Sequence, residues 1–322
     1  MESKVKFSVI VPVYNSENTL KELFTRLKET FVSMNETFEV IFVNDHSRDS
    51  SYPILREIFK ENKSEVTVID LLRNYGQHNA IMCGFNYANG EFVITIDDDL
   101  QNPPQEIPEL YEEILKGFDA VFGVPNDKQH KKYKNLGSHF IRRLNHKTFN
   151  IKDDLSFSSY RMIRKEIVDE IKDLKTPFPY ISGMILTVTR SVSNVTVAHN
   201  RRQHGQSNYT LSKLIRLAFN LLINYSSIPL RYVGAFGLVI SILSFLLAGA
   251  YIFKELIVGN APPGWTTLVV LISFYNSVIL VIFFILGEYI SRMLRELSNE
   301  KQYSIRRISE KEPNGKLTEV ID

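Results

Sequence analysis

The chain has 322 residues, of which 44% are hydrophobic and 23% charged, and its formal net charge is +2. The hydrophobic content excludes an intrinsically disordered chain, and the small net charge argues against nucleic acid as a partner, because a surface that binds nucleic acid carries a strong basic excess. The sequence contains neither a dinucleotide-binding nor a P-loop glycine motif. A chain of this length is expected to form about two folding units.

Apolar, β-branched runs alternate with helical patterns through the first part of the chain. This alternation predicts an α/β domain in which a mostly parallel sheet is covered by helices on both faces. In such sheets, ligands bind beyond the carboxyl ends of the strands. The expected strands and helices, in chain order, are Phe7 to Val11, Glu17 to Phe31, Phe38 to Val43, Tyr52 to Lys60, Val66 to Ile69, Asn79 to Ala88, Phe92 to Ile96, Glu106 to Leu115 and Ala120 to Val124.

The expected strand ends carry polar side chains, of which the run Asp97-Asp98-Asp99 is the most informative. Adjacent carboxylates repel one another, so this run at the end of a buried strand favours a bound cation. Residues two apart on a strand point to the same side, so Asp97 and Asp99 are expected to share a Mg²⁺ or Mn²⁺ ion, with Asp98 facing elsewhere. Gln101 is expected to be a further oxygen ligand, and an acidic loop that merely faces solvent is the alternative.

Two long uncharged stretches lie in the C-terminal third, from Tyr232 to Phe253 and from Trp265 to Leu286. As a helix, each is long enough to cross the roughly 30 Å hydrocarbon core of a bilayer. Basic residues gather before the first stretch and after the second, which predicts that the α/β domain and both chain ends lie in the cytoplasm, with two spans in the cytoplasmic (inner) membrane. Two buried helices of a soluble bundle are the alternative.

The segment from Ser207 to Ser227 has apolar residues at three- and four-residue steps and basic residues on its other side. This pattern predicts an amphipathic helix in the headgroup region, with a core helix as the alternative. The tail after Arg307 is polar and is expected to be mobile. The expected organisation is an α/β domain over 1–206, an amphipathic helix over 207–230, two membrane helices with a short external loop over 231–287, and a cytoplasmic tail over 288–322.

Six motifs carry a resemblance to a known family. The sequence contains VIVPVYN, FVNDHSRDSS, LRNYGQHNA, ITIDDDLQNPP and RRQHGQSNYTLSKLIRL in this order, and GEYISR follows the second uncharged stretch. The chain resembles glycosyltransferase family 2, the inverting transferases with the GT-A fold, and more narrowly its polyprenyl-phosphate glycosyltransferases. These include dolichol-phosphate mannose synthases, bactoprenol glucosyltransferases and undecaprenyl-phosphate aminoarabinose-type transferases. The resemblance implies transfer of a sugar from a nucleotide-diphosphate donor, expected to be UDP-linked, to polyprenyl (undecaprenyl) phosphate.

The resemblance also implies roles for individual residues, including a basic residue and a serine that hold the acceptor phosphate. By this resemblance the nucleotide is bound by Pro12, Tyr14, Glu17, Asp45, Arg73, Gly76 and Asp97, the metal by Asp97, Asp99 and Gln101, and the catalytic groups are Asp99, Lys134, Ser138 and Arg161.

Two positions depart from the family pattern. The segment Gly123 to Asp127 lacks a basic residue that many relatives carry there, and Ser159 stands where several have an aspartate that could serve as a base. A phosphate monoester is already largely ionised at pH 7, so a lipid phosphate needs no base, whereas a hydroxyl acceptor does. The alternatives are a membrane-tethered transferase that acts on a glycan hydroxyl, with Asp153 or Asp154 as its base, and a catalytically degenerate membrane scaffold. The sequence does not determine which sugar is transferred, which metal is bound or whether the protein forms a homo-oligomer.

Overall fold

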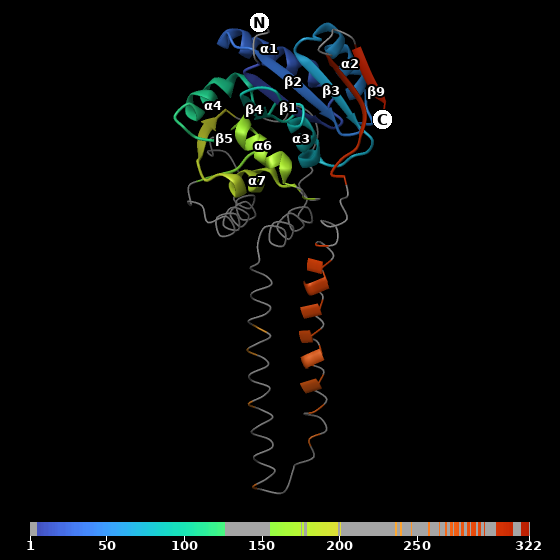
Figure 1. The fold of residues 1–322 in the computed structure, drawn as a ribbon, viewed down its shortest axis with the longest axis vertical. Coiled ribbons are helices and arrows are strands. Elements are labelled where there is room, and N and C mark those ends of the chain that lie inside the picture. Colours follow the sequence, from blue (N-terminus) through green and yellow to red (C-terminus); the bar gives the residue numbers. More distant parts are fainter. Residues whose placement is uncertain are drawn as a thin grey trace. The chain divides into compact units, whose positions relative to one another are not determined.

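The computed structural model describes residues 5–125, 155–174, 176, 179–198, 200, 301–311 and 317–321, together with isolated residues between 236 and 293 (Figure 1). The chain divides into two compact units. One unit comprises Met1–Thr210 together with Lys301–Asp322, and the other comprises Leu211–Glu300.

The first unit is built on a nine-stranded sheet in the order β7-β5-β6-β4-β1-β2-β3-β8-β9. Strand β1 pairs in parallel with β2 and with β4, and β2 pairs in parallel with β3, so these four strands end at the same edge of the sheet. Strands β6, β8 and β9 are antiparallel to their neighbours. The bounds are β1 Phe7–Val13, β2 Phe38–Asn44, β3 Val66–Leu71, β4 Phe92–Thr95, β5 Ala120–Pro125, β6 Arg161–Arg164, β7 Val192–Val197, β8 Ile305–Lys311 and β9 Leu317–Ile321.

Helices cover both faces of this sheet (Figure 1). Alternation along β1 shows how the two layers form: Val9 and Val11 belong to the core shared with α1 and α2, while Ile10 contacts α3 at Gly84. A Cβ at Gly84 would lie only 2.5 Å from the Ile10 side chain, so this glycine permits the close approach of α3 to the sheet. The helices are α1 Leu20–Met34, α2 Ser51–Glu61, α3 Gln77–Phe85, the 3-10 helix η1 Pro104–Glu106, α4 Ile107–Ile114, α6 Lys165–Asp173 and α7 Ile181–Val188.

The alternating pattern therefore predicted the first half of the sheet correctly. Strands β1 to β5 begin at the predicted residues and end within two residues of the predicted ends, and the helix bounds differ by up to three residues. Helix α1 begins at Leu20 instead of Glu17 because the preceding residues form a loop at the carboxyl edge of the sheet.

The prediction of a mobile tail after Arg307 is wrong. Residues 305–311 form β8, which pairs antiparallel with β3, and residues 317–321 form β9, which pairs with β8. Figure 1 shows these C-terminal strands, in red, beside β3 and α2. The polar sequence of the tail gave no sign of these strands, because a strand at the edge of a sheet needs few apolar side chains when its backbone groups are paired.

Several predictions fall on residues outside those that the structure describes. They are the amphipathic helix over 207–227, the acceptor-phosphate residues Lys134 and Ser138, the alternative bases Asp153 and Asp154, and most of the two uncharged stretches. Among the described residues, no helix combines the length and the apolar character needed to cross a membrane.

Candidate functional site

The loops that follow β1 and β2 are bonded to each other at the carboxyl edge of the sheet. The backbone N–H of Asn15 donates to the Ser47 hydroxyl at 3.0 Å, and the backbone N–H of Arg48 donates to the Asn15 side chain at 2.8 Å. Such reciprocal bonds fix two loops in one arrangement. The sequence prediction that polar strand ends gather at this edge is confirmed for this pair.

Asp98 connects the acidic turn after β4 to the loop after β1. Its Oδ2 accepts hydrogen bonds from the backbone N–H of Tyr14, at 3.1 Å, and from the Ser16 hydroxyl. Burial raises the pKa of Asp98 to about 7, while these two donors act in the opposite direction. Asp98 therefore has a structural role in this turn, with hydrogen-bond partners other than those of Asp97 and Asp99.

Asp97 is held by two neutral donors from elements that are distant in sequence. The Gln77 side-chain amide, at the start of α3, donates to Oδ1 at 2.6 Å. The Ser159 hydroxyl, just before β6, donates to Oδ2. These two bonds fix the orientation of the carboxylate, and neither of them offsets its charge.

Asp99 lies in the turn beyond the strand rather than on it, because β4 ends at Thr95. Its Oδ1 accepts the backbone N–H of Gln101 at 3.1 Å. Among the described residues, no group of three or more His, Cys, Asp or Glu side chains is arranged to hold a metal ion by itself. Magnesium sites of the kind found in phosphate-transferring enzymes use one or two carboxylates and complete their shell with water and substrate phosphate. The oxygen donors of Asp97, Asp99 and Gln101 fit such an ion.

Arg161 lies beneath this turn and is fully buried. Its Nε donates to the Thr95 hydroxyl at 3.0 Å and its Nη1 to the Ser182 hydroxyl at 3.0 Å. Burial lowers the pKa of Arg161 to about 10, and burial lowers the pKa of the neighbouring His78 to about 4, so that only the arginine is charged near neutral pH. The Thr95 hydroxyl in turn donates to the Ser159 carbonyl, so Arg161 supports Ser159 from inside the protein.

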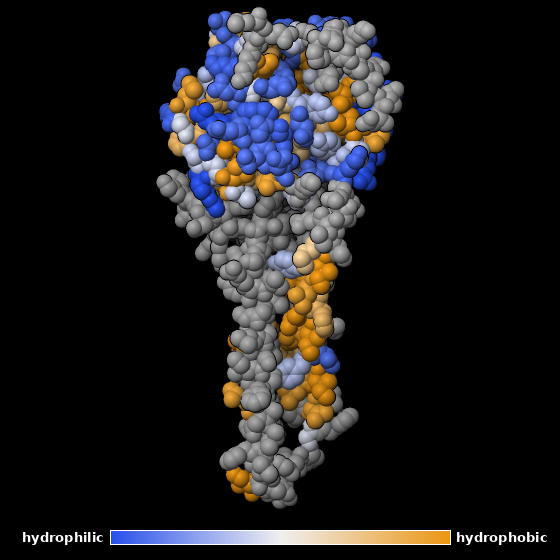
Figure 2. All heavy atoms as spheres, viewed as in Figure 1, coloured by the Kyte–Doolittle hydropathy of each residue, from blue (hydrophilic) through white to orange (hydrophobic). Residues whose placement is uncertain are grey.

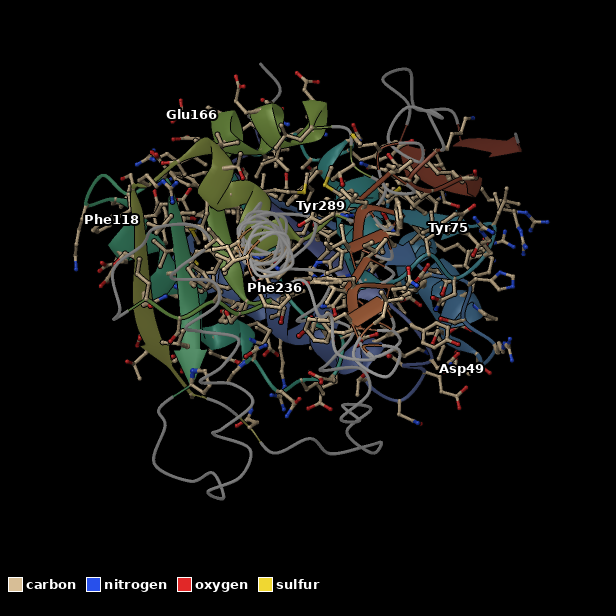
Figure 3. All side chains as sticks on the ribbon, turned by 90° about the horizontal axis from the view of Figure 1, so that it is seen from below. Asp49, Tyr75, Phe118, Glu166, Phe236 and Tyr289 are labelled. Carbon is tan, nitrogen blue, oxygen red and sulfur yellow. The ribbon has the colours of Figure 1, made fainter. Side chains whose placement is uncertain are left out.

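Asp45, at the end of β2, closes the loop between β3 and α3. Its two carboxylate oxygens accept the backbone N–H groups of Tyr75, at 2.7 Å, and Gly76, at 2.8 Å. Gly76 has a φ of 89°, a backbone conformation that side chains disfavour. The guanidinium of Arg73 lies over the Tyr75 ring, 4.8 Å from its centroid. Figure 3 shows Tyr75 and Asp49 at the right of the view and Phe118 at the left.

The remaining residues predicted for nucleotide binding lie on β1 and the loop after it. Pro12 is buried within β1, whereas the Tyr14 side chain is exposed. The Glu17 carboxylate accepts the backbone N–H of Ser50 at 2.8 Å, and the backbone N–H of Glu17 donates to Asp49 at 3.1 Å. The structure thus brings the loops after β1, β2, β3 and β4 into one bonded group.

Backbone strain is concentrated in three of these four loops. Asn15, His46 and Leu100 all have φ between 55° and 60°, in the left-handed region that residues other than glycine seldom occupy. Each such residue costs of order 1–3 kcal/mol and persists where the surrounding structure imposes it. The strain marks this edge of the sheet as the candidate functional site.

Sequence reasoning missed three groups that the structure places here. Gln77 lies within the motif LRNYGQHNA but carried no predicted role, and Ser159 was noticed only as a departure from the family pattern. Arg306 donates to the carbonyl of Leu72 across more than two hundred residues of sequence, a contact that no local pattern could reveal.

Comparison with known proteins identifies the family. Glycosyl transferase family 2 matches residues 8–172. An undecaprenyl-phosphate 4-deoxy-4-formamido-L-arabinose transferase of Edwardsiella ictaluri is 35% identical over 307 residues, which cover 94% of this chain and 93% of that protein. The transferase of the same name from Proteus mirabilis is 35% identical over 312 residues, 96% of each chain.

The fold is also found among solved structures. The crystal structure of glucosyl-3-phosphoglycerate synthase from Mycobacterium tuberculosis, in complex with Mn²⁺, UDP and phosphoglyceric acid, matches with a TM-score of 0.51 at 16% sequence identity. The match covers 68% of this chain and 76% of that chain, and at this identity it supports a GT-A-like α/β fold. Together with the family match and the relatives, these findings show that the chain belongs to glycosyltransferase family 2 and is a nucleotide-sugar-dependent glycosyltransferase.

Proposed function

We propose that the chain transfers one sugar from a nucleotide-diphosphate donor, a UDP-sugar, to polyprenyl phosphate and so forms a polyprenyl-phosphate sugar. The observation that carries this proposal is the bonded group of loops around the acidic turn, in a chain that resembles transferases named for undecaprenyl phosphate over nearly its full length. Polyprenyl phosphate and the nucleotide sugar are the partners, and the bilayer supplies the lipid.

Asp97, Asp99 and Gln101 would hold a Mg²⁺ or Mn²⁺ ion at the donor diphosphate. When bound, such an ion neutralises the charge that develops on the leaving diphosphate. Gln77 and Ser159 keep the Asp97 carboxylate in one orientation, and Asp98 fixes the turn through the loop after β1. The protein thus orients these ligands before the donor binds.

The acceptor chemistry needs no general base. Ser159, which stands at the position of a family aspartate, donates its hydroxyl to Asp97 and so cannot accept a proton from an acceptor hydroxyl in this arrangement. A phosphate monoester is already anionic at neutral pH and can attack the anomeric carbon directly. Lys134 and Ser138 would hold this phosphate, and the charge of Arg161 would support the site from below.

We assign the expected membrane segments on the same basis, with an amphipathic helix over 207–230 and two membrane spans within 231–287. Both chain ends and the catalytic domain would lie on the cytoplasmic side of the inner membrane. Large hydrophobic side chains are exposed at the described positions of the second stretch, including Phe274 at 54% and Phe283 at 65% (Figure 2). Exposed apolar side chains in such number favour contact with lipid.

The test is a transfer assay on the purified full-length protein. Radiolabelled UDP-sugars are offered with a short polyprenyl phosphate, or with a glycan that presents free hydroxyls. We expect label in the lipid product only with polyprenyl phosphate and only when Mg²⁺ or Mn²⁺ is present. Transfer to the glycan alone would replace the proposal with the hydroxyl-acceptor alternative, and the absence of transfer with every nucleotide sugar would overturn it.

A further inference from the structure

The C-terminal strand β8 reaches the carboxyl end of β3, beside the loops of the candidate site. Asp70 pairs with Arg307 and Leu71 with Ile305, so that Arg306 lies in a bulge of the ladder between them. A bulge leaves one residue unpaired and redirects its side chain. Beyond the bulge, pairing continues through the backbone N–H of Leu72, which donates to the carbonyl of Ser304 at 3.0 Å.

From this bulge, Arg306 binds two groups on β3 and the loop after it. Its Nη2 donates to the carbonyl of Leu72 at 3.1 Å, and its Nη1 lies 3.9 Å from Oδ2 of Asp70. The Asp70 side chain is only 6% exposed, whereas that of Arg306 is 40% exposed. A nearly buried carboxylate requires a charged or hydrogen-bonding partner, and Arg306 is one such partner.

Two chains of contacts lead from Arg306 to the expected base end of the nucleotide site, the first beginning at the ion pair with Asp70 and the second at the hydrogen bond to Leu72. In the first, Asp70 accepts the side-chain amide of Asn44 at 2.7 Å, and the Asn44 oxygen accepts the backbone N–H of Ser47 at 3.3 Å. This chain ends in the loop after β2.

The second chain of bonds runs through the loop between β3 and α3. Arg306 fixes this loop at Leu72, and the same loop carries the amides of Tyr75 and Gly76 that bind Asp45. Both chains therefore end beside Asp45, one of the residues that the family resemblance assigns to nucleotide binding.

Neighbouring residues attach the same C-terminal segment to the domain. The Asn86 side-chain amide, at the end of α3, donates to the Tyr303 hydroxyl at 2.8 Å. The Gln302 side-chain amide donates to the carbonyl of Thr176 at 2.7 Å. Arg306 thus belongs to a segment that is bonded to β3, to the end of α3 and to Thr176, rather than to a loose end of the chain.

We propose that Arg306 is a positioning residue for the nucleotide, and that it sets the affinity for the donor by fixing Asp70 and the loop between β3 and α3. This inference rests on the proposed function, because it takes the bonded loops as the nucleotide site. Arg306 acts through its neighbours at the base end. Its loss is therefore expected to weaken donor binding while the chemical step keeps its rate.

The test uses the full-length protein in detergent, with UDP and Mn²⁺ as the probe in calorimetry. Arg306→Gln is expected to weaken UDP binding by about tenfold, and Arg306→Lys by about threefold, because lysine keeps the charge but cannot reach the Leu72 carbonyl and Asp70 with two separate nitrogens. Lys301→Gln is the matched control, since Lys301 is an exposed basic residue of the same segment, and it is expected to leave UDP affinity within about twofold of wild type. In the transfer assay, Arg306→Gln should raise the donor KM with kcat and the acceptor KM unchanged.

The outcomes separate this inference from the proposed function. If the wild type binds UDP and Arg306→Gln binds it equally well, the inference is overturned and the proposed function stands. If Arg306→Gln does not fold, Arg306→Lys decides, and a wild-type affinity in that variant overturns the inference. If the wild type binds none of UDP, GDP and dTDP, the nucleotide site itself is wrong and both proposals are overturned. A fall in kcat with an unchanged donor KM would also overturn the positioning role.

Discussion

The two ends of the candidate donor site are stabilised in different ways. At the acidic turn after β4, the donors to Asp97 and Asp99 described above are neutral: an amide, a hydroxyl and a backbone N–H. At the opposite end, Asp45 accepts two backbone N–H groups, and Asp70 has the Asn44 amide and the Arg306 guanidinium beside it.

This difference suggests that the two ends recognise different parts of the donor. Neutral hydrogen-bond donors orient the carboxylates of the acidic turn, where a cation would bind together with the donor diphosphate. The base end is already organised by protein groups alone. We therefore expect metal dependence to be confined to the acidic turn, and the following predictions test this division.

The largest effect is expected from Asp99→Asn, which removes a proposed metal ligand with little change in size. Loss of several kcal/mol of metal-assisted stabilisation corresponds to a fall of about 1,000-fold in kcat/KM. The matched control is Asp98→Asn in the same turn, because an asparagine oxygen can still accept from Tyr14 and Ser16. We expect that control to stay within about threefold of wild type in the transfer assay. Equal losses in the two variants would remove the distinction between a ligand and a structural aspartate.

Removal of the cation is expected to act on the diphosphate end alone. With EDTA, the affinity for UDP should fall by about 100-fold, because the carboxylates then face the diphosphate without a cation between them. The affinity for uridine, which carries no phosphate, should be unchanged. Both affinities can be measured by equilibrium dialysis with and without Mn²⁺, and a parallel loss for uridine would show that the cation organises the base end as well.

Gln77→Ala tests whether orientation of Asp97 matters. Partners that orient a metal ligand typically contribute 10- to 100-fold to metal affinity, so we expect Mn²⁺ to bind about tenfold more weakly in the presence of UDP. Uridine affinity should not change, since the Gln77 side chain donates to Asp97 at the acidic turn. Gln105→Ala, an exposed glutamine on η1, is the control. Mn²⁺ binding like that of the wild type in Gln77→Ala would mean that Ser159 alone is sufficient to hold the carboxylate.

The smallest effect on the metal is expected from Asp45→Ala. This change leaves the amides of Tyr75 and Gly76 without their acceptor, at a cost of about 1–3 kcal/mol, so the loop loses its fixed form. Uridine and UDP should both bind several-fold more weakly, by about the same factor with and without Mn²⁺. A loss that appears only with Mn²⁺ would contradict the separation of the two ends.

The sequence predicted the central strands and the gathering of polar residues at their ends. The apolar runs identified the buried strands, and parallel strands end at the same edge of a sheet. Because Asp45 and Asp97 follow two of these runs, their position at this edge could be predicted. Asp98 has hydrogen-bond partners other than those of Asp97 and Asp99, but β4 ends before the acidic run, so the strand alternation behind the prediction does not apply to this turn.

The parts that could not be predicted depend on contacts between distant residues. Ser159 donates to Asp97 although the two residues are more than sixty positions apart in the sequence. Arg306 lies beside Asp70 although it comes from the C-terminal end of the chain. The tail that carries Arg306 has a polar sequence, and its strand forms only because β3 offers an edge with unpaired backbone groups. The periodicity and composition of the tail itself carry no information about the free edge of β3, with which it pairs.

The measurement that tests the account most directly is electron paramagnetic resonance of Mn²⁺ titrated into the full-length protein with and without UDP. Mn²⁺ should bind weakly to the protein alone and at least tenfold more tightly when UDP is present, because the protein supplies only part of the coordination shell. Asp99→Asn should abolish this gain, while Asp98→Asn should keep it. Mn²⁺ binding that does not respond to UDP, or that survives unchanged in Asp99→Asn, would contradict the assignment of the acidic turn.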